Sequence, residues 1–424
     1  MVSFSETTFI GSPDWMTSKS ARRIIRALKS GGQPVRFVGG CVRDSLLGKV
    51  VRDIDVATPE KPENVIKILG EWGVSVNLTG LKYGTVTAET EGQQIDITTL
   101  RVDTRTDGRW AEVEFTEDWY ADARRRDFTM NALYCDPDGR IHDVVGGVAD
   151  IKAKRVRFIG DPLTRISEDY LRLLRFFRFI AWYNLGLPDR SAIEACGVAA
   201  TYLSTISGER IWREFSRLLI APDPVPVLIL MGKYSIINEL FPYADFTSLD
   251  NKLLESMVRA EKRHDAIPNA IRRLAAWLRP IVTNNRSQQI IEKISNRLAL
   301  TKSERLQLEQ LVFYKYELRK EFAVNQCRKV RYFLDDPFAF NELALFQAAL
   351  EDGNHKSWEV IMQLPHTDPL PVFPIRGEDI LALGVKQGPR VGKLLAETEE
   401  WWLQRNFLDD RKSLLNYVKT LLRG

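Results

Sequence analysis

The pattern of apolar residues changes about one third of the way along the chain. Up to about Phe158, short runs rich in β-branched and aromatic residues alternate with helical stretches such as Pro62 to Trp72, which is typical of an α/β domain. Beyond Asp161 such runs nearly vanish, and apolar residues recur with the period of a helix. The expected strands are Val35 to Val38, Ile54 to Ala57, Gly84 to Glu89, Ile95 to Leu100, Val113 to Phe115 and Ala132 to Cys135.

The remainder of the chain predicts helices. Thr301 to Glu304 is a capping box, which predicts a helix that begins there and ends at about Leu318. Leu364 to Pro374 carries four prolines and predicts an extended connector. The other expected helices are Thr164 to Tyr183, Ser207 to Leu219, Ser248 to His264, Asn269 to Leu278, Ser287 to Leu298, Phe338 to Glu351, Arg390 to Phe407 and Arg411 to Leu422.

The first candidate for chemistry is a glycine pair that follows a buried strand. The apolar run Pro34 to Val38 breaks at Gly39 and Gly40, and a short helix is expected from Cys41 to Leu47. Glycine lets the backbone approach an anion, the first helical turn offers unpaired N–H groups, and Arg43 adds a forked positive charge. The stretch therefore predicts a phosphate-binding turn. It is not a Walker-type P-loop, because no Gly-Lys-Ser/Thr follows the glycines.

Three carboxylates are candidates for a metal site next to this turn. Asp53 and Asp55 are two apart in an expected strand, so their side chains point to the same face and can hold hard Mg²⁺ ions. Asp96, between two isoleucines of another strand, is the best candidate for a third ligand. It is equally well explained as the solvent-facing residue of an edge strand. Three acids would let two metal ions lie close together, as nucleotidyl transfer requires.

Composition adds limits rather than an activity. The chain has 424 residues, of which 44% are hydrophobic and 27% charged, as in ordinary globular proteins. The four cysteines are far apart and show neither a zinc spacing nor a disulfide framework. We expect a soluble cytoplasmic protein, since no targeting leader and no membrane-length apolar run is found in the sequence.

The positive charge is unevenly distributed. A formal net charge of +4 is too small to indicate nucleic-acid binding. The segment from Ile151 to Ile180, however, carries eight cations and three acids and is a candidate anion-binding face.

Two further stretches carry candidate site residues. Three adjacent arginines precede Asp127, and they form either a solvated charge run or a site in which Arg125 and Arg126 hold phosphates while Asp127 accepts a ribose hydroxyl. The apolar residues after Asp127 favour the fixed site. Upstream, the polar segment Arg101 to Arg109 predicts a mobile loop near the site.

A row of charged residues is expected on the helix over Thr164 to Tyr183. These residues recur every third position and are Asp169, Arg172, Arg175 and Arg178. Asp169 and Arg172 are either a surface ion pair or a recognition pair for a base. A carboxylate acceptor beside a guanidinium donor matches cytosine (N4, N3) and adenine (N6, N1), whereas uracil and guanine invert that order. The pair therefore predicts selection of CTP and ATP.

These motifs together resemble class II tRNA nucleotidyltransferases, the CCA-adding enzymes. The motifs that carry the resemblance are Gly-Gly-x-Val-Arg-Asp with Asp-x-Asp, Arg-Arg-Asp-Phe-Thr-x-Asn-Ala-Leu, Asp143 to Asp150, Glu-Asp-x-x-Arg and Ser207 to Glu214. The resemblance implies an α+β protein with a polymerase β-like nucleotidyltransferase head followed by a helical neck, body and tail. The implied boundaries are 1–158 for the head, 159–222 for the neck, 223–364 for the body and 365–424 for the tail.

The resemblance also implies roles for individual residues. Asp53 and Asp55 correspond to the ligands of Mg²⁺. The base is read by Asp169 and Arg172, and the loop from Arg101 to Arg109 is linked to addition of the final A. The residues expected along the phosphates and ribose are Gly39, Gly40, Arg43, Arg125, Arg126, Asp127, Arg175 and Arg178. The implied partners are tRNA, CTP and ATP, with pyrophosphate released.

The C-terminal segment predicts an RNA contact. Gly384 can end one helix and Gly388 can precede the next, so that Lys386, Arg390 and Lys393 surround a helix start that could hold RNA phosphates. A plain helical hairpin explains the same residues equally well.

Other activities remain open at this point. A poly(A) polymerase shares the first motifs, and CC-adding or A-adding specialists are further options. A non-catalytic RNA-binding protein and a nucleotidyltransferase for small molecules are less favoured, because the aspartates and the phosphate turn are intact and the helical part is large and basic. The sequence does not indicate the oligomeric state.

Overall fold

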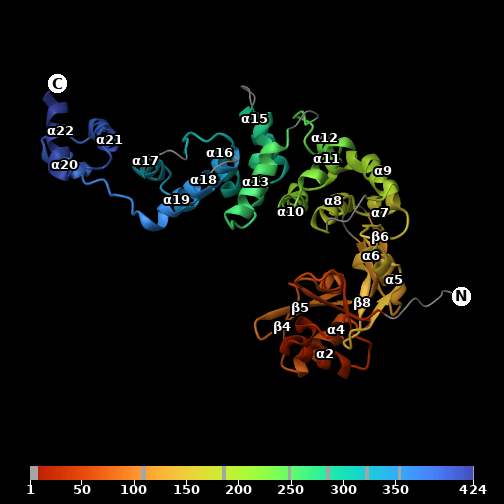
Figure 1. Cartoon of the computed structure of the whole chain (residues 1–424). Coiled ribbons are helices and arrows are strands. Elements are labelled where there is room, and N and C mark those ends of the chain that lie inside the picture. The colour runs from red at the N-terminus through yellow and green to blue at the C-terminus, as the bar shows by residue number, and fades with distance from the viewer. Residues whose placement is uncertain are drawn as a thin grey trace. The chain divides into compact units, whose positions relative to one another are not determined.

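The structure is a computed structural model that describes residues 8–106, 111–183, 188–246, 250–282, 287–319, 324–351 and 355–423 (Figure 1). The chain packs as two compact units. The first comprises Met1–Thr247 with Asn296–Ala299, and the second comprises Ser248–Ser295 with Leu300–Gly424. The division into head, neck, body and tail stays a prediction. Within the described ranges, no helix is both long and apolar enough to span a bilayer.

The first unit begins with a seven-stranded mixed sheet of strand order β3-β4-β5-β2-β1-β8-β9. β2 and β5 run parallel, and the other neighbouring strands run antiparallel. The mixed sheet followed by helices confirms the α+β prediction. The short strands β3 and β9 were not predicted. The strands are β1 Arg36–Val38, β2 Ile54–Thr58, β3 Ser75–Asn77, β4 Thr85–Thr90, β5 Gln93–Thr99, β8 Leu133–Cys135 and β9 Ile141–Asp143.

Two further strands form a separate hairpin. β6 (Arg101–Thr106) pairs antiparallel with β7 (Ala111–Phe115). The prediction of a mobile loop is therefore wrong for residues 101–106. Val102, Thr104 and Thr106 place β-branched residues at every second position, a strand pattern that the charges between them obscured. Residues 107–109 of the predicted loop lie outside the described part of the chain.

The helices of the first unit include one correction that affects the site. The single helix expected from Thr164 to Tyr183 is two helices, because Asp169 is extended, with φ −154° and ψ 103°. Asp169 therefore does not lie in a helical row with the three arginines. The helices are α1 Asp14–Thr17, α2 Lys19–Ser30, α3 Gly40–Leu46, α4 Pro62–Glu71, α5 Trp119–Arg124, α6 Gly147–Lys152, α7 Pro162–Glu168, α8 Leu171–Tyr183, α9 Arg190–Ala199, α10 Gly208–Leu219, α11 Val225–Lys233 and α12 Ile236–Leu240, with 3₁₀ turns η1 Leu81–Tyr83, η2 Thr129–Asn131 and η3 Ala200–Thr205.

A cluster of buried aromatic rings fixes α8 against the sheet domain. Phe128 lies between α5 and η2, and its ring centroid is 4.8 Å from that of Phe158 and 5.2 Å from that of Phe179. Phe158 in turn stacks on Phe176 at 5.3 Å. Because Phe176 and Phe179 belong to α8, these contacts hold the arginines of that helix at a fixed position beside the sheet.

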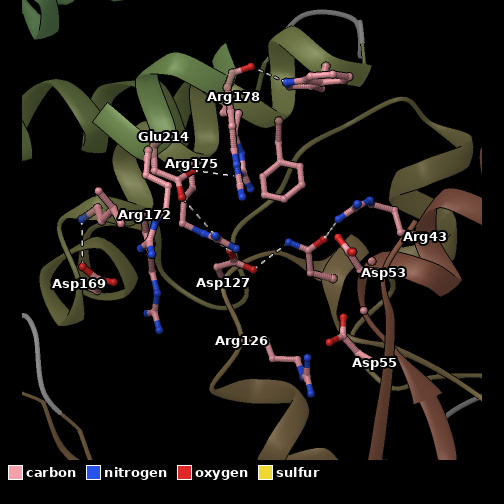
Figure 2. Close-up of a pocket in the computed structure, with 18 of the residues that line it drawn as sticks. Arg43, Asp53, Asp55, Arg126, Asp127, Asp169, Arg172, Arg175, Arg178 and Glu214 are labelled. Atoms are coloured by element: carbon pink, nitrogen blue, oxygen red, sulfur yellow. Dashed lines mark hydrogen bonds and ion pairs between the residues drawn. The ribbon is translucent and has the colours of Figure 1, made fainter. Parts of the chain in front are cut away.

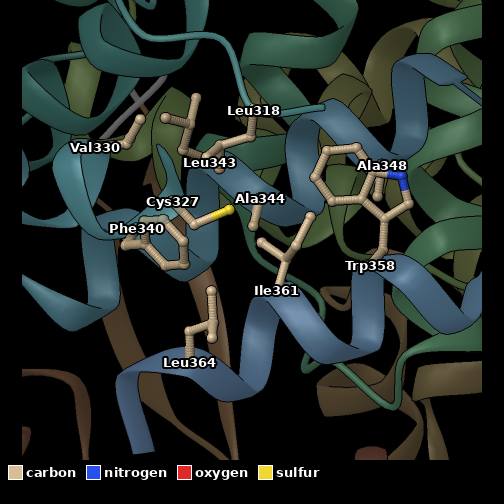
Figure 3. Close-up of a cluster of buried hydrophobic side chains, with 10 residues drawn as sticks. All are labelled: Leu318, Cys327, Val330, Phe340, Leu343, Ala344, Ala348, Trp358, Ile361 and Leu364. Atoms are coloured by element: carbon tan, nitrogen blue, oxygen red, sulfur yellow. The ribbon is translucent and has the colours of Figure 1, made fainter. Parts of the chain in front are cut away.

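The second unit is helical, and Figure 3 shows one of its buried clusters, in which Phe340, Trp358 and Ile361 pack together with Leu364. Leu364 was predicted to begin an extended connector, but its burial keeps it in α19, which continues through Pro365. The expected helix to Leu318 ends earlier, because Leu318 is buried in the same cluster outside α16. The helices are α13 Lys252–Arg263, α14 Ala270–Leu278, α15 Ser287–Arg297, α16 Lys302–Val312, α17 Val324–Leu334, α18 Pro337–Glu351, α19 His355–Thr367, α20 Gly377–Ala382, α21 Pro389–Gln404 and α22 Arg411–Arg423, with η4 Arg279–Ile281.

Candidate active site

A cavity of about 1090 Å³ lies within the first unit and gathers nearly all residues predicted for the site. Of the predicted residues in this unit, Asp96 is the one that does not line it. The lining includes twelve cationic and eight acidic side chains, so that its walls carry an excess of four positive charges. Figure 2 shows Asp53 and Asp55 on one side of the cavity and Asp169 and Arg172 on the other.

The glycine turn lies between β1 and α3. Gly39 has φ +74°, a conformation that favours glycine, and α3 begins at Gly40. Arg43 is 8% exposed. Its Nε and Nη2 donate to the two carboxylate oxygens of Asp44 at 2.9 and 3.1 Å, and its Nη1 donates to Asn131. The predicted phosphate ligand is thus held rigidly at the cavity wall by its neighbours.

The predicted metal ligands Asp53 and Asp55 lie at the start of β2. Asp53 directly precedes the strand, and Asp55 lies between the buried Ile54 and Val56, so its carboxylate faces the cavity. Burial and the neighbouring charge of Asp96 raise the pKa of Asp55 to about 6, against the opposing effect of Arg126. The raised pKa reflects burial first and the neighbouring negative charge second.

Asp96 lies beside Asp55, because the two residues are register partners on the parallel strands β5 and β2. Its Oδ1 accepts a hydrogen bond from the Thr87 hydroxyl at 2.6 Å. Within the described ranges, no group of three or more His, Cys, Asp or Glu residues is arranged to hold a metal ion. The role of Asp96 as third ligand stays a prediction.

The two predicted phosphate arginines share one buried carboxylate. Asp122 is 1% exposed, accepts from Arg125 Nε at 2.8 Å and accepts from Arg126 Nη2 at 3.1 Å. The hydroxyl of Tyr134 donates to the same carboxylate at 2.6 Å. Burial alone would raise the pKa of Asp122, but the two arginines hold it well below its usual range. The arginines are therefore a fixed site rather than a solvated charge run.

Asp127, predicted to bind a ribose hydroxyl, is fully engaged within the protein. Its Oδ1 accepts from Asn131 Nδ2 at 2.9 Å and from the backbone N–H of Phe128 at 2.8 Å, and its Oδ2 accepts from Arg175 Nε at 2.7 Å. Burial opposes ionisation, but the adjacent Arg175 and these hydrogen bonds lower the pKa of Asp127 to about 2. Asp127 thus links Phe128 and Asn131 of the sheet domain to Arg175 on α8.

The candidate base-reading residues lie on the cavity wall opposite Asp55. Asp169 is in the extended link between α7 and α8, where its Oδ1 accepts from the backbone N–H of Leu171 at 3.1 Å. Arg210 of α10 donates through Nη2 to both oxygens of Asp169, at 3.0 and 2.9 Å. The alternative of an ion pair between Asp169 and Arg172 is not found.

Arg172 has its own partners. Its Nη1 donates to Glu168 and to the carbonyl oxygen of Arg165, and its Nη2 donates to the carbonyl oxygen of Arg125 at 3.2 Å. These three bonds leave Nε and one Nη2 hydrogen of the five guanidinium N–H groups available. Asp169 and Arg172 are therefore held separately and keep hydrogen-bonding capacity toward the cavity.

A buried glutamate holds the other two arginines of α8. Glu214 of α10 is 2% exposed, and its carboxylate oxygens lie 3.7 Å from Arg175 Nη1 and 3.1 Å from Arg178 Nη1. Burial lowers the pKa of Arg178 to about 10, although Glu214 opposes this shift. Arg175 and Arg178 line the cavity, as predicted.

Several residues in or next to the cavity had no predicted role, although the sequence signal was present. Arg210 and Glu214 fall in the motif Ser207 to Glu214, which contributed to the resemblance without a function for any member. Asp122 precedes the arginine triplet at helical spacing and could have been recognised as their counterion. Conversely, Arg155 and Arg157 of the predicted anion-binding segment do not line the cavity, because both pair with the buried Asp150.

The predicted RNA contacts of the second unit are solvent-exposed. Lys386 lies between α20 and α21, while Arg390 and Lys393 are in the first turns of α21. Lys393 Nζ is 3.9 Å from Glu397. Gly384 has φ +89° just after α20, and Gly388 precedes α21, as predicted. The contact with RNA stays a prediction.

Comparison with known proteins places these residues in a family context. Residues 35–157 match the poly A polymerase head domain, and residues 189–247 match a domain described as the probable RNA and SrmB-binding site of polymerase A. The CCA-adding enzyme of Bacillus stearothermophilus, solved in complex with CTP, has the same fold, with a TM-score of 0.79, 24% identity and coverage of 96% of this chain and 97% of that chain.

Full-length relatives are also found. The mitochondrial CCA tRNA nucleotidyltransferase 1 of Homo sapiens is 32% identical over 391 residues, which are 91% of this chain and 86% of the human protein. The CCA-adding enzyme of Streptococcus mutans is 28% identical over 416 residues, 95% of this chain and 96% of that protein. The cytoplasmic location of this chain stays a prediction. Both the motifs in the cavity and the likeness along nearly the whole length show that this chain belongs to the CCA tRNA nucleotidyltransferase family.

Proposed function

We propose that this chain adds C, C and A to the 3′ end of tRNA from CTP and ATP, without a nucleic-acid template, by two-metal-ion nucleotidyl transfer. The observation that carries the proposal is the cavity itself. It places a carboxylate pair, Asp53 and Asp55, opposite a carboxylate and a guanidinium, Asp169 and Arg172. The first pair suits phosphate chemistry and the second suits recognition of a base.

The residues around β2 fit Mg²⁺. They offer carboxylate oxygens, which are the ligands that this hard cation prefers. Burial and the charge of Asp96 disfavour ionisation of Asp55 and raise its pKa to about 6. A cation held by Asp53 and Asp55 would offset the repulsion between these neighbouring carboxylates. When bound, the ions supply charge neutralisation to the phosphates and increase the acidity of the attacking hydroxyl.

The basic wall positions the nucleotide. In the proposed reaction, the 3′ hydroxyl of the RNA releases its proton to solvent and its oxygen forms a bond to the α-phosphorus. The bond between the α-phosphorus and the oxygen that bridges to the β-phosphorus breaks. Pyrophosphate leaves with the negative charge. Arg43 and Arg126, fixed by the buried residues Asn131 and Asp122, hold the phosphates during this step. Asp127 holds Arg175 in place.

The opposite wall selects the base. Arg210 orients Asp169 as an acceptor, while Glu168 orients Arg172 as a donor. Cytosine and adenine each present an amino donor next to a ring-nitrogen acceptor, which matches this pair. Uracil and guanine would set like groups against each other, at a cost of about 1 to 3 kcal/mol for each buried mismatch.

One experiment tests the proposal. A tRNA that ends at the discriminator base is incubated with CTP, with ATP and with both, in Mg²⁺ buffer, and the products are sequenced. We expect two C residues with CTP alone and a terminal C-C-A with both nucleotides. A long A tract would instead identify a poly(A) polymerase, which the matched head domain keeps as the second candidate. Addition that stops after CC in the presence of ATP would identify a CC-adding specialist, and no incorporation would indicate RNA binding without catalysis.

A further inference from the structure

Arg101, the first residue of β6, carries buried hydrogen-bond donors without a partner. Its side chain lines the cavity, and its Nε and Nη1 are buried with no hydrogen-bond partner among the described residues. A guanidinium stays charged and has five N–H donors, so leaving two of its nitrogen atoms dry and unpaired is unfavourable. A retained cost of this kind is typical of a group whose partner arrives with a ligand.

The neighbouring carboxylates do not supply that partner. Asp122 already accepts from Arg125, Arg126 and Tyr134, and its Oδ1 also accepts the backbone N–H of Arg101 at 3.3 Å. These bonds use the lone pairs of both oxygens, so none remains for the Arg101 side chain. The carboxylate of Asp103 attracts Arg101 electrostatically but forms no hydrogen bond with it.

The local charge balance also points to an anion. Three guanidinium groups, those of Arg101, Arg125 and Arg126, interact electrostatically around the carboxylates of Asp122 and Asp103. Among these five groups the guanidinium groups outnumber the carboxylates by one, and the lining of the whole cavity is positive as well. Burial, and then the repulsion from Arg125, lower the pKa of Arg101 to about 10, so that the group remains protonated at neutral pH. An anion that enters the cavity would relieve both the repulsion and the missing hydrogen bonds.

We propose that Arg101 is a phosphate-binding residue that completes the site with Nε and Nη1 when the reactants enter. Nε and Nη1 point to different sides of the guanidinium, so each needs its own acceptor oxygen, and either of them can form a fork with Nη2 on two oxygens of a phosphate group. This inference rests on the proposed function, because the reactants of nucleotidyl transfer bring phosphates as their anionic groups. The phosphate comes from one of two sources, the triphosphate of the incoming nucleotide or the last phosphodiester of the RNA.

The test compares Arg101→Met, which keeps the length of the side chain without its charge, with Arg101→Lys, which keeps the charge without the fork. Arg190→Met is the matched control, because Arg190 is 89% exposed in its side chain on α9 and lies outside the cavity. The full-length proteins are assayed for CMP incorporation into tRNA, for the KM of CTP, for the Kd of tRNA and for thermal unfolding without ligands.

For Arg101→Met we expect a loss of about tenfold or more in kcat/KM with little change for the control, and partial recovery in Arg101→Lys. A rise in the KM of CTP at unchanged tRNA affinity identifies the nucleotide as the source. A weaker tRNA affinity, together with a decrease of about 0.7 in the slope of log Kd against log salt concentration, identifies the RNA phosphodiester as the source.

Thermal unfolding separates a binding role from a structural one. Removing an unpaired buried charge should leave the unfolding temperature of Arg101→Met equal to or above that of the wild type, while activity falls. A clearly lower unfolding temperature with activity reduced only in proportion to the folded fraction would show a structural role and overturn the inference. So would kinetic constants within twofold of the wild type. If the wild-type chain itself incorporates no nucleotide, the proposed function fails instead.

Discussion

Replacing Asp55 with Asn should abolish nucleotide incorporation and, without a divalent cation, make the folded protein more stable. The carboxylate lies between buried residues of β2 and beside Asp96, and its pKa is raised to about 6 from the usual 3.8, chiefly by burial. A buried and repelled carboxylate destabilises the fold when it is ionised. Asn has nearly the same shape and no charge, so it removes this cost together with the proposed metal ligand.

The size and sign of the effect follow from proton linkage. An acid whose pKa is higher in the folded protein is stabilised by protonation, so stability falls as the pH rises from about 4 to about 6 and stays reduced above pH 6. A difference of about two pKa units corresponds to about 3 kcal/mol. Asp55→Asn should therefore be more stable than the wild type by up to about 3 kcal/mol at pH 8, and by about half as much at pH 5, because part of the wild-type population is then protonated.

Scanning calorimetry in EDTA at pH 5 and pH 8 measures this difference. For a domain of this size we expect an unfolding temperature higher by roughly 6 to 12 °C at pH 8. Adding Mg²⁺ should stabilise the wild type, by about 2.7 kcal/mol at 100 times the Kd, and leave Asp55→Asn unchanged. In the wild type, kcat/KM at low Mg²⁺ should rise as the pH increases through about 6, because the ionised carboxylate binds the cation.

Asp223→Asn is the matched control. Asp223 is solvent-exposed outside the cavity, so the same change of charge there should leave the pH dependence and the response to Mg²⁺ intact. The reasoning is refuted if Asp55→Asn unfolds at a lower temperature than the wild type in EDTA at pH 8, or if it keeps the full stabilisation by Mg²⁺.

Three further predictions concern the other walls of the cavity and the second unit. Arg210→Met should reduce discrimination of CTP against UTP by about tenfold, because Asp169 loses the donor that orients it; competition between the two nucleotides measures this. Glu214→Gln should destabilise the protein by about 2 kcal/mol in thermal unfolding, since Arg178 loses the carboxylate beside it while Arg175 keeps Asp127. Replacing the exposed cations Lys386, Arg390 and Lys393 with Gln should weaken tRNA binding severalfold at low salt, as measured by filter binding. The KM of CTP, measured by steady-state kinetics, should not change.

The sequence predicted which residues line the cavity better than it predicted the elements that carry them. Gly39, Asp55 and Arg172 were identified because each residue type has a direct chemical meaning at its spacing, and the structure places all of them on one cavity. The helix break at Asp169 was missed because the apolar period continues across it. The break depends on hydrogen bonds to Leu171 and to the distant Arg210, and only the first of these is local in the sequence.

The partners of the predicted residues could not be found from local patterns for a physical reason. The sequence does not indicate which groups bind the guanidinium groups of the cavity. In the structure, carboxylates or amides accept hydrogen bonds from Arg43, Arg126 and Arg175. Burying an arginine is favourable only when its donors are satisfied, so the fold must supply counterions wherever the charge has to stay fixed. Among the described residues, Arg101 is the arginine that lines the cavity with buried donors left over, and we assign these donors to the charge of the substrate.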